Sequence, residues 1–139
     1  NYRLTDIQCA LGISQLDRAE QGVVKRNKIA QKYDSAFKNH PIKTIEVDSD
    51  MIHAYHLYVI QLENRKAIFD ALRKENIFAQ IHYIPVHLQP YYKKLYGFKE
   101  GDFPDAERYY QKCISLPMYP TLLDEEQEYV IEQVFKNIK

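Results

Sequence analysis

The sequence has 139 residues, the size of one ordinary domain, and a domain of this size buries about two thirds of the surface that its unfolded chain exposes. It carries 19 Lys and Arg against 19 Asp and Glu, so no net charge favours nucleic acid or an anionic membrane surface. No apolar run approaches the roughly 18 residues of a transmembrane helix, and we expect neither nucleic acid nor membrane as a partner.

The cysteines indicate the compartment of the protein, and the start of the chain indicates whether it is a segment of a larger one. Cys9 and Cys113 stand far apart, without CxxC or disulfide-framework spacing, so we expect reduced thiols in a cytoplasmic protein. The sequence opens NYRLTDIQ, with neither Met nor a signal-peptide pattern. We therefore expect a segment of a larger protein.

The first predicted element is one long helix over residues 5–39. Its apolar stripe consists of Leu16, Ala19, Val23, Ile29, Ala30, Tyr33, Ala36 and Phe37. Thr5 can cap the start while Gln8 reaches back to it, as in a capping box. Pro41 marks the end, because the residue before a proline is pushed out of helical geometry.

The central part predicts strands on either side of a helix. The strands are expected at residues 42–47, 53–62 and 77–84. The second of them alternates two apolar sets, which indicates a strand covered on both faces. Residues 64–76 predict a helix that Asn64 caps and that Asn76 stops in a left-handed conformation.

Two short amphipathic helices are predicted near the C-terminus, over residues 103–113 and 123–139. Asp124 and Gln127 have the spacing of a capping box for the second, and SLPMYP between the helices is expected to be extended. The fold class is therefore α+β: a small antiparallel sheet with a long N-terminal helix and further helices, in one domain covering residues 1–139.

Motifs for metal binding and nucleophilic catalysis are weak. His53 and His56 are three apart on a predicted strand, so they face opposite sides and cannot clamp one ion without a bulge. The chain has no GxSxG elbow and no glycine-rich phosphate loop. We expect no metal site and no catalytic residue in this chain.

The stretch AQIHYIPVHLQPYY, residues 79–92, is the most unusual, and no helical pattern follows it directly. Its prolines stiffen a bend that carries ring-borne polar groups, namely His82, Tyr83, His87, Tyr91 and Tyr92. Such groups suit a polar, partly apolar ligand such as a sugar phosphate. The alternative is that the tyrosines bury their rings and leave their hydroxyls in water, and the residues alone leave both interpretations open.

Four motifs occur in a fixed order: NYRLTDIQCALGISQLDR, HAYHLYVIQL, HYIPVHLQPYY and SLPMYP before a helix starting DEEQ. Together they resemble the DegT/DnrJ/EryC1/StrS family of sugar aminotransferases, whose N-x-R-(L/M)-(T/S)-(D/E)-(I/L) pattern lies near the join between two domains. The resemblance covers essentially the whole chain. The members it resembles most aminate UDP-4-keto-6-deoxy-N-acetylhexosamines.

The resemblance implies a fold type I enzyme that uses pyridoxal phosphate (PLP), takes its amino group from glutamate and acts on a nucleotide sugar as a homodimer. The family's Schiff-base lysine and other main cofactor ligands lie upstream of the N-x-R motif. By this resemblance, residues 1–139 are the C-terminal small domain, the large PLP-binding domain is missing, and the chain alone is inactive.

The resemblance also implies roles for individual residues. Asn1 matches an asparagine that reaches the PLP phosphate of a neighbouring subunit, and Arg3 adjoins it and is expected on the substrate side. His82, Tyr83 and His87 match the bend that lines the nucleotide-sugar side of the cleft. The competing hypothesis is a free-standing, non-catalytic module that binds sugar nucleotides, and the upstream reading frame would separate the two.

Overall fold

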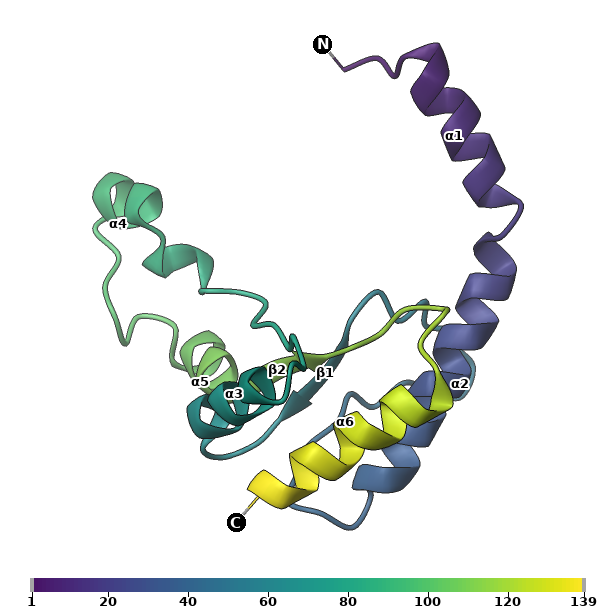
Figure 1. Ribbon diagram of the computed structural model, residues 1–139. Helices are drawn as coiled ribbons and strands as arrows, with labels where there is room; N and C mark the ends of the chain where they lie inside the picture. The colour runs from purple at the N-terminus through teal and green to yellow at the C-terminus, as the bar shows by residue number, and fades with distance from the viewer. Residues whose placement is uncertain (1, 139) are drawn as a thin grey trace.

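The computed structural model describes residues 2–138 and has an α+β architecture, as the sequence predicts (Figure 1). In chain order the elements are α1 (Asp6–Leu16), α2 (Ala19–Phe37), β1 (Tyr58–Gln61), α3 (Arg65–Lys74), the 3-10 helix η1 (Val86–Leu88), α4 (Pro90–Tyr96), α5 (Pro104–Lys112), β2 (Cys113–Leu116) and α6 (Asp124–Asn137).

The N-terminal helix begins as predicted but is not continuous. The Thr5 amide donates to Gln8 Oε1 at 2.9 Å, and the Gln8 amide donates to Thr5 Oγ1 at 3.3 Å, which confirms the capping box. The single helix predicted over residues 5–39 is wrong, because Asp17 and Arg18 separate α1 from α2.

Packing explains this break. None of residues 6–16, all of which the structure describes, is buried, and Leu16 is 71% exposed. The predicted stripe reaches the core only in the second half of α2, through Ile29, Ala30, Tyr33 and Phe37. With no burial to hold α1 in line with α2, nothing within the described chain opposes a turn between them.

The sheet is antiparallel and small. β1 pairs with β2 so that Tyr58 faces Leu116 and Ile60 faces Ile114. Single bridges extend the sheet at both edges: the first joins Lys43 to Gln61, and the second joins Gln80 to Ser115. The outer two predicted strands, at residues 42–47 and 77–84, are thus reduced to one bridge each.

The predicted strand over residues 53–62 shortens to Tyr58–Gln61 for a local reason. Tyr55 has a φ of 44°, a conformation that interrupts an extended chain. On the outer side of β1, the segment around Lys43 pairs within the described residues only at Gln61. The prediction that this strand is covered on both faces is confirmed, since Tyr58, Val59 and Ile60 are all buried.

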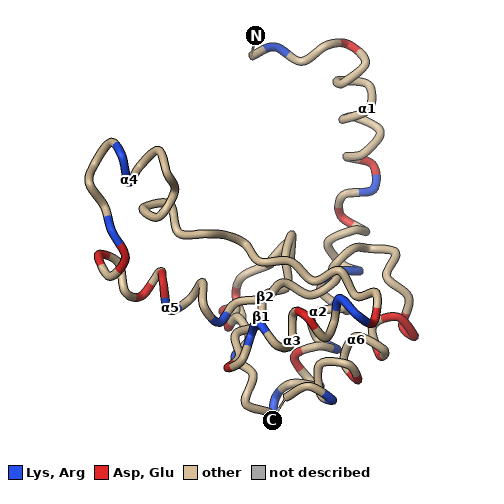
Figure 2. The backbone as a smooth tube through the Cα atoms, turned by 60° about the vertical axis from the view of Figure 1, so that its left-hand side comes forward, with Lys and Arg blue, Asp and Glu red and all other residues tan. Residues whose placement is uncertain are grey.

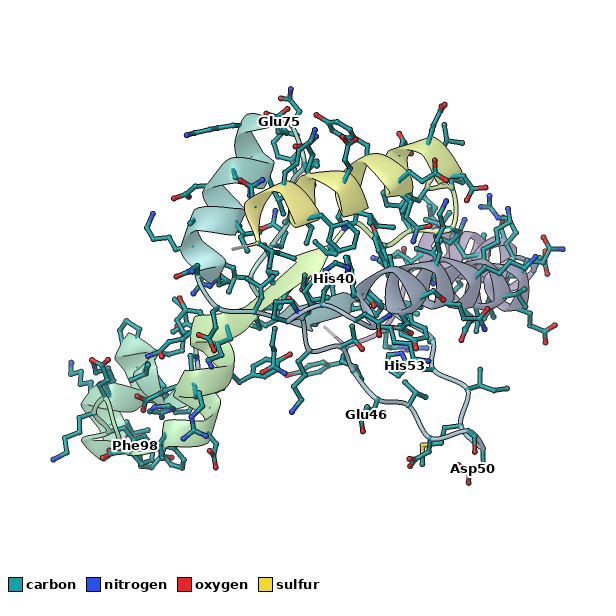
Figure 3. All side chains as sticks on the ribbon, turned by 90° about the horizontal axis from the view of Figure 1, so that it is seen from below. His40, Glu46, Asp50, His53, Glu75 and Phe98 are labelled. Carbon is teal, nitrogen blue, oxygen red and sulfur yellow. The ribbon has the colours of Figure 1, made fainter. Side chains whose placement is uncertain are left out.

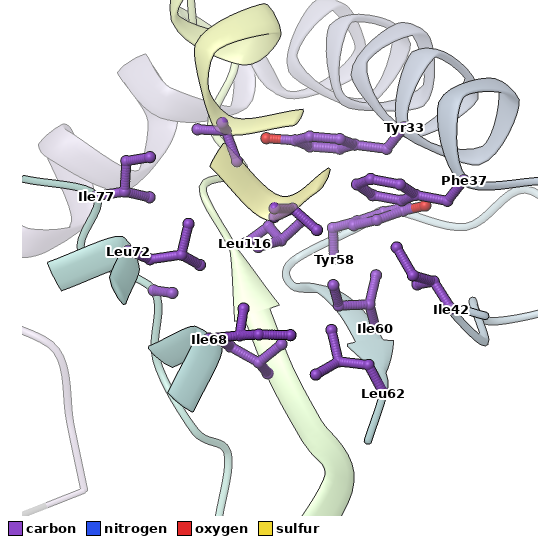
Figure 4. Packing of buried hydrophobic residues seen from close by; sticks show 14 of the residues in the cluster. Tyr33, Phe37, Ile42, Tyr58, Ile60, Leu62, Ile68, Leu72, Ile77 and Leu116 are labelled. Atoms are coloured by element: carbon purple, nitrogen blue, oxygen red, sulfur yellow. The ribbon is translucent and has the colours of Figure 1, made fainter. Parts of the chain in front are cut away.

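The core lies where α2, α3 and α6 meet one face of the sheet (Figure 4). Its most deeply buried members are Tyr33, Phe37, Ile60, Ile68, Leu72, Ile114 and Val134. Two polar side chains fasten the helices over this core: the Tyr33 hydroxyl donates to the Pro117 carbonyl at 3.1 Å, and Gln127 Nε2 donates to the Ile29 carbonyl at 2.8 Å.

The boundaries of α3 agree closely with the prediction, but its cap differs. Asn76 has a φ of 58°, which confirms the left-handed stop. Asn64 also lies in the left-handed region, with a φ of 56°, and its side chain makes no capping hydrogen bond among the described residues. Asn64 therefore acts through its backbone conformation and not through the predicted side-chain cap.

The C-terminal helices also lie where they are predicted, while the predicted cap differs. α5 and α6 lie where helices are predicted, and the start of SLPMYP is extended because Ser115 and Leu116 belong to β2. The predicted capping pair of Asp124 and Gln127 is wrong. The Leu123 amide instead donates to Glu126 Oε2 at 2.9 Å, and Gln127 is needed in the core.

The segment from residue 83 to residue 103, here called the arm, leaves the core and returns to it at α5 (Figure 1). It carries η1 and α4, which the sequence analysis did not predict. α4 starts at Pro90, whose fixed φ suits a first helical turn, and ends at Gly97 with a φ of 71°. Seven residues are too few to show a helical period, so the prolines pointed to a bend alone.

Residues of both charges occur throughout the fold. Figure 2 shows Lys and Arg interspersed with Asp and Glu along the chain, including the arm. Of the helices formed within residues 2–138, none has both the length and the apolar character required to cross a membrane.

Candidate functional site

His82 is the best-placed polar group of the bend. It follows the bridge between Gln80 and Ser115, and its Nδ1 lies 2.8 Å from Ser115 Oγ. Ser115 alternates along β2 with the core residues Ile114 and Leu116, so its side chain and the imidazole lie on the other face of the sheet. Ser115 is buried and fixes the ring at one nitrogen.

The second nitrogen of this ring is available to a ligand. Within residues 2–138 no hydrogen-bond partner is assigned to His82 Nε2, and the side chain is half-buried. The adjoining Tyr83 ring meets the imidazole edge-on, with ring centroids 4.6 Å apart, and is 72% exposed. An imidazole N–H and a phenol hydroxyl side by side can donate to the oxygens of a phosphate or a sugar.

His87 occupies a different environment. Its ring is buried, with 6% of the residue exposed, and its Nε2 lies 2.8 Å from Glu107 Oε1. The Glu107 carboxylate also accepts from the amides of Gly101, at 2.9 and 3.0 Å, and Phe103, at 3.4 Å. The structure therefore places the His87 ring, within the arm, against α5 and apart from the exposed pair formed by His82 and Tyr83.

The hydrogen bond from His87 is the main reason why the pKa of the Glu107 carboxyl lies below its ordinary value, with the amides of Gly101 and Phe103 acting in the same direction against the effect of burial. Sequence reasoning missed Glu107. The structure buries Glu107 on the same helix as the half-buried Tyr110.

The tyrosines of the bend divide between the two interpretations. Tyr91 is 68% exposed and Tyr92 is 38% exposed. A series of ring contacts runs from Tyr91 through Tyr92, Tyr96, Phe98 and Phe103 to His87. The arm thus contains a small aromatic cluster of its own while leaving phenol groups at the surface.

Arg3 lies far from the bend (Figure 1). Arg3 is exposed just before α1, and Asn1 lies outside the described residues. Figures 1 and 2 both show the N-terminal end of α1 and the arm projecting separately from the core. The structure therefore brings His82 and Tyr83 together and does not bring Arg3 to them.

His53, outside the bend, has a local role. His53 Nδ1 accepts a hydrogen bond from the Tyr55 amide at 3.0 Å, and its ring packs edge-on against the Tyr55 ring. Figure 3 shows His53 and His40 at separate points of the fold. Within residues 2–138 no three His, Cys, Asp or Glu side chains group in a way that could hold a metal ion.

An α+β chain whose bend presents an imidazole and a phenol is suited to binding ligands that carry hydroxyl and phosphate groups. A model of the DegT/DnrJ/EryC1/StrS aminotransferase family matches residues 1–135, and the chain belongs to this family.

Known relatives agree with this assignment. The spore coat polysaccharide biosynthesis protein SpsC of Bacillus subtilis is 43% identical, over 96% of this chain and 36% of its own length. Among solved structures, Helicobacter pylori PseC, an aminotransferase involved in the biosynthesis of pseudoaminic acid, is 33% identical with a TM-score of 0.89, over 99% of this chain and 38% of its own. The PLP-form of Spr1654 from Streptococcus pneumoniae is 32% identical, also with a TM-score of 0.89, over 99% and 37%.

The chain thus spans little more than a third of the length of these relatives. The family to which the chain belongs uses PLP as its cofactor. Each lysine within residues 2–138 is at least partly exposed.

Proposed function

We propose that residues 1–139 are the C-terminal small domain of a PLP-dependent aminotransferase that transfers an amino group, from glutamate, to a nucleotide-linked keto-deoxy sugar for a surface polysaccharide or glycan. The observation that carries the proposal is the family match over residues 1–135. The likeness to SpsC and PseC supports a role in glycan biosynthesis.

On the substrate side, we assign the contact with the nucleotide sugar first to His82 and Tyr83. Ser115 holds one nitrogen of the imidazole at 2.8 Å and leaves the other to donate to a diphosphate or hexose oxygen. A ring already held in place loses little conformational entropy when the ligand binds. Arg3 and His87 remain predicted substrate-side residues, His87 through its place at the base of the arm.

On the cofactor side, this chain supplies at most one group. Asn1 is proposed to reach the PLP phosphate of the partner subunit in a homodimer. When bound, PLP supplies the electron sink that amino-group transfer requires. Because the chain spans little more than a third of the length of its relatives, the lysine that carries PLP is proposed to lie in the large domain, and the isolated chain is expected to be inactive.

The proposal is tested on the full-length protein with PLP, glutamate and a UDP-4-keto-6-deoxy-N-acetylhexosamine. Formation of the 4-amino sugar is the expected result. A protein that binds the sugar nucleotide without converting it would instead support the non-catalytic binding module.

A further inference from the structure

The arm leaves the core through one segment of the chain and returns through another (Figure 1). Its orientation therefore depends on the contacts that hold these two segments. Glu107, on α5, contacts both the outgoing and the returning segment of the arm. It accepts from the His87 ring on the outgoing side and from the amides of Gly101 and Phe103 on the returning side. One carboxylate therefore ties the start and the end of the arm to a helix that adjoins the sheet.

This connection is buried and its donors are matched to the carboxylate. Glu107 is 8% exposed and His87 is 6% exposed. A carboxylate out of water is tolerated only when its oxygens are hydrogen-bonded, so the bonded arrangement is strongly preferred over one in which the arm has moved away. The Phe103 ring closes the base further by lying 4.7 Å from the His87 ring.

The position of His87 is transmitted to the exposed part of the bend through short local bonds. His87 is the middle residue of η1, which is held by the Leu88 amide donating to the Pro85 carbonyl at 2.9 Å. Gln89 Nε2 reaches back to the Ile84 carbonyl at 3.3 Å. Ile84 directly follows Tyr83, so the orientation of that phenol depends on where η1 is fixed.

We propose that Glu107 is a positioning residue for nucleotide-sugar binding: it fixes His87 and the base of the arm, and thereby sets the orientation of Tyr83 beside His82. This inference rests on the proposed function, because it concerns the substrate side of the same site. It assigns His87 a role through the arm and leaves direct contact with the ligand to His82 and Tyr83.

The test compares three variants of the full-length protein. Glu107→Ala removes every hydrogen bond that the Glu107 side chain makes to the arm, whereas Glu107→Gln keeps an amide oxygen that can accept from Gly101 and Phe103. Asp105→Asn is the matched control, because Asp105 is an exposed carboxylate on the same helix, paired with Arg108 at 2.9 Å. The measurements are hydrogen exchange across residues 83–103, the melting temperature, and KM and kcat for the nucleotide sugar and for glutamate.

For Glu107→Ala we expect amide exchange in the arm to rise about tenfold while exchange in β1 stays unchanged. We expect KM for the nucleotide sugar to rise about tenfold, with the kinetics of glutamate changed by less than about twofold. Glu107→Gln should fall between Glu107→Ala and the wild type, and Asp105→Asn should match the wild type.

Unchanged exchange in the arm, or a loss of both sugar and glutamate kinetics in step with the melting temperature, would overturn the role of Glu107. Glu107→Gln decides the matter if Glu107→Ala does not fold. A wild-type protein that never aminates a nucleotide sugar would overturn the proposed function itself, which is a distinct outcome from normal wild-type activity with unaffected variants.

Discussion

Replacing His82 by alanine tests the geometry of the bend most sharply. In the full-length protein, His82→Ala removes the Nε2 donor and leaves Ser115 Oγ, buried in β2, without its partner at 2.8 Å. A hydrogen bond to a charged group is worth about 1.5 to 3 kcal/mol, which corresponds to a loss of about 10- to 150-fold in kcat/KM for the nucleotide sugar. Because His82 is only half-buried, the lower half of this range is expected.

The assay separates the two substrates. Transfer of the amino group from glutamate to the cofactor needs no contact with a diphosphate, so its rate should change far less than the rate with the nucleotide sugar. His56→Ala is the matched control, since His56 is exposed and lies outside the bend. If both reactions decline together with the melting temperature, the imidazole is a packing group and does not contact the nucleotide sugar.

Further predictions concern stability, pH and the cofactor. Tyr58→Phe removes a hydrogen bond of 2.6 Å to Asp34 Oδ1 and should lower the free energy of unfolding by about 1 to 2 kcal/mol in urea titration, whereas an unchanged midpoint would contradict the bond. The pKa of Glu107 is lowered in the folded protein, so its contribution to stability is complete above the ordinary value of 4.5 and lost as pH falls through the lowered value; acid unfolding of Glu107→Gln should be less steep, and identical curves would argue against it. The isolated chain should bind PLP negligibly, and a stoichiometric absorbance band on adding PLP would contradict this. In the full-length protein, Asn1→Ala should weaken PLP retention without loss of fold, and unchanged affinity would remove Asn1 from the site.

The helices with strong packing faces could be predicted from the sequence. In α3 and α6 the apolar residues recur at helical spacing, and Ile68, Leu72, Val130 and Val134 are indeed buried. α1 shows the limit of this reasoning. Its sequence is apolar enough to extend the stripe of α2, yet none of residues 6–16 is buried in the structure, and a periodic pattern alone does not tell which partner a face will meet.

Strand lengths depend on pairing partners that lie elsewhere in the sequence. Residues 42–47 and 77–84 have the composition of strands, but in the structure they pair with β1 and β2 only through single bridges. The extent of a strand is therefore a property of the sheet and not of the segment.

Only the part of the candidate site that is local in sequence could be predicted. The residue types and close spacing of His82 and Tyr83 are enough to indicate a polar ligand, because both residues come from one short stretch of chain. Glu107 could not be associated with His87, since 20 residues separate them and their contact forms only when α5 packs against the base of the arm. Burial of a charged side chain is a tertiary property that local spacing does not reveal.

Amino transfer to a nucleotide sugar is the activity proposed for the full-length enzyme. The most direct measurement supplies the full-length protein with PLP, isotope-labelled glutamate and a UDP-4-keto-6-deoxy-N-acetylhexosamine, and follows the label by mass spectrometry. We predict that labelled nitrogen appears on the sugar with the full-length protein and not with residues 1–139 alone. Retention of all label in glutamate, with the sugar nucleotide bound and unchanged, would contradict the proposed activity.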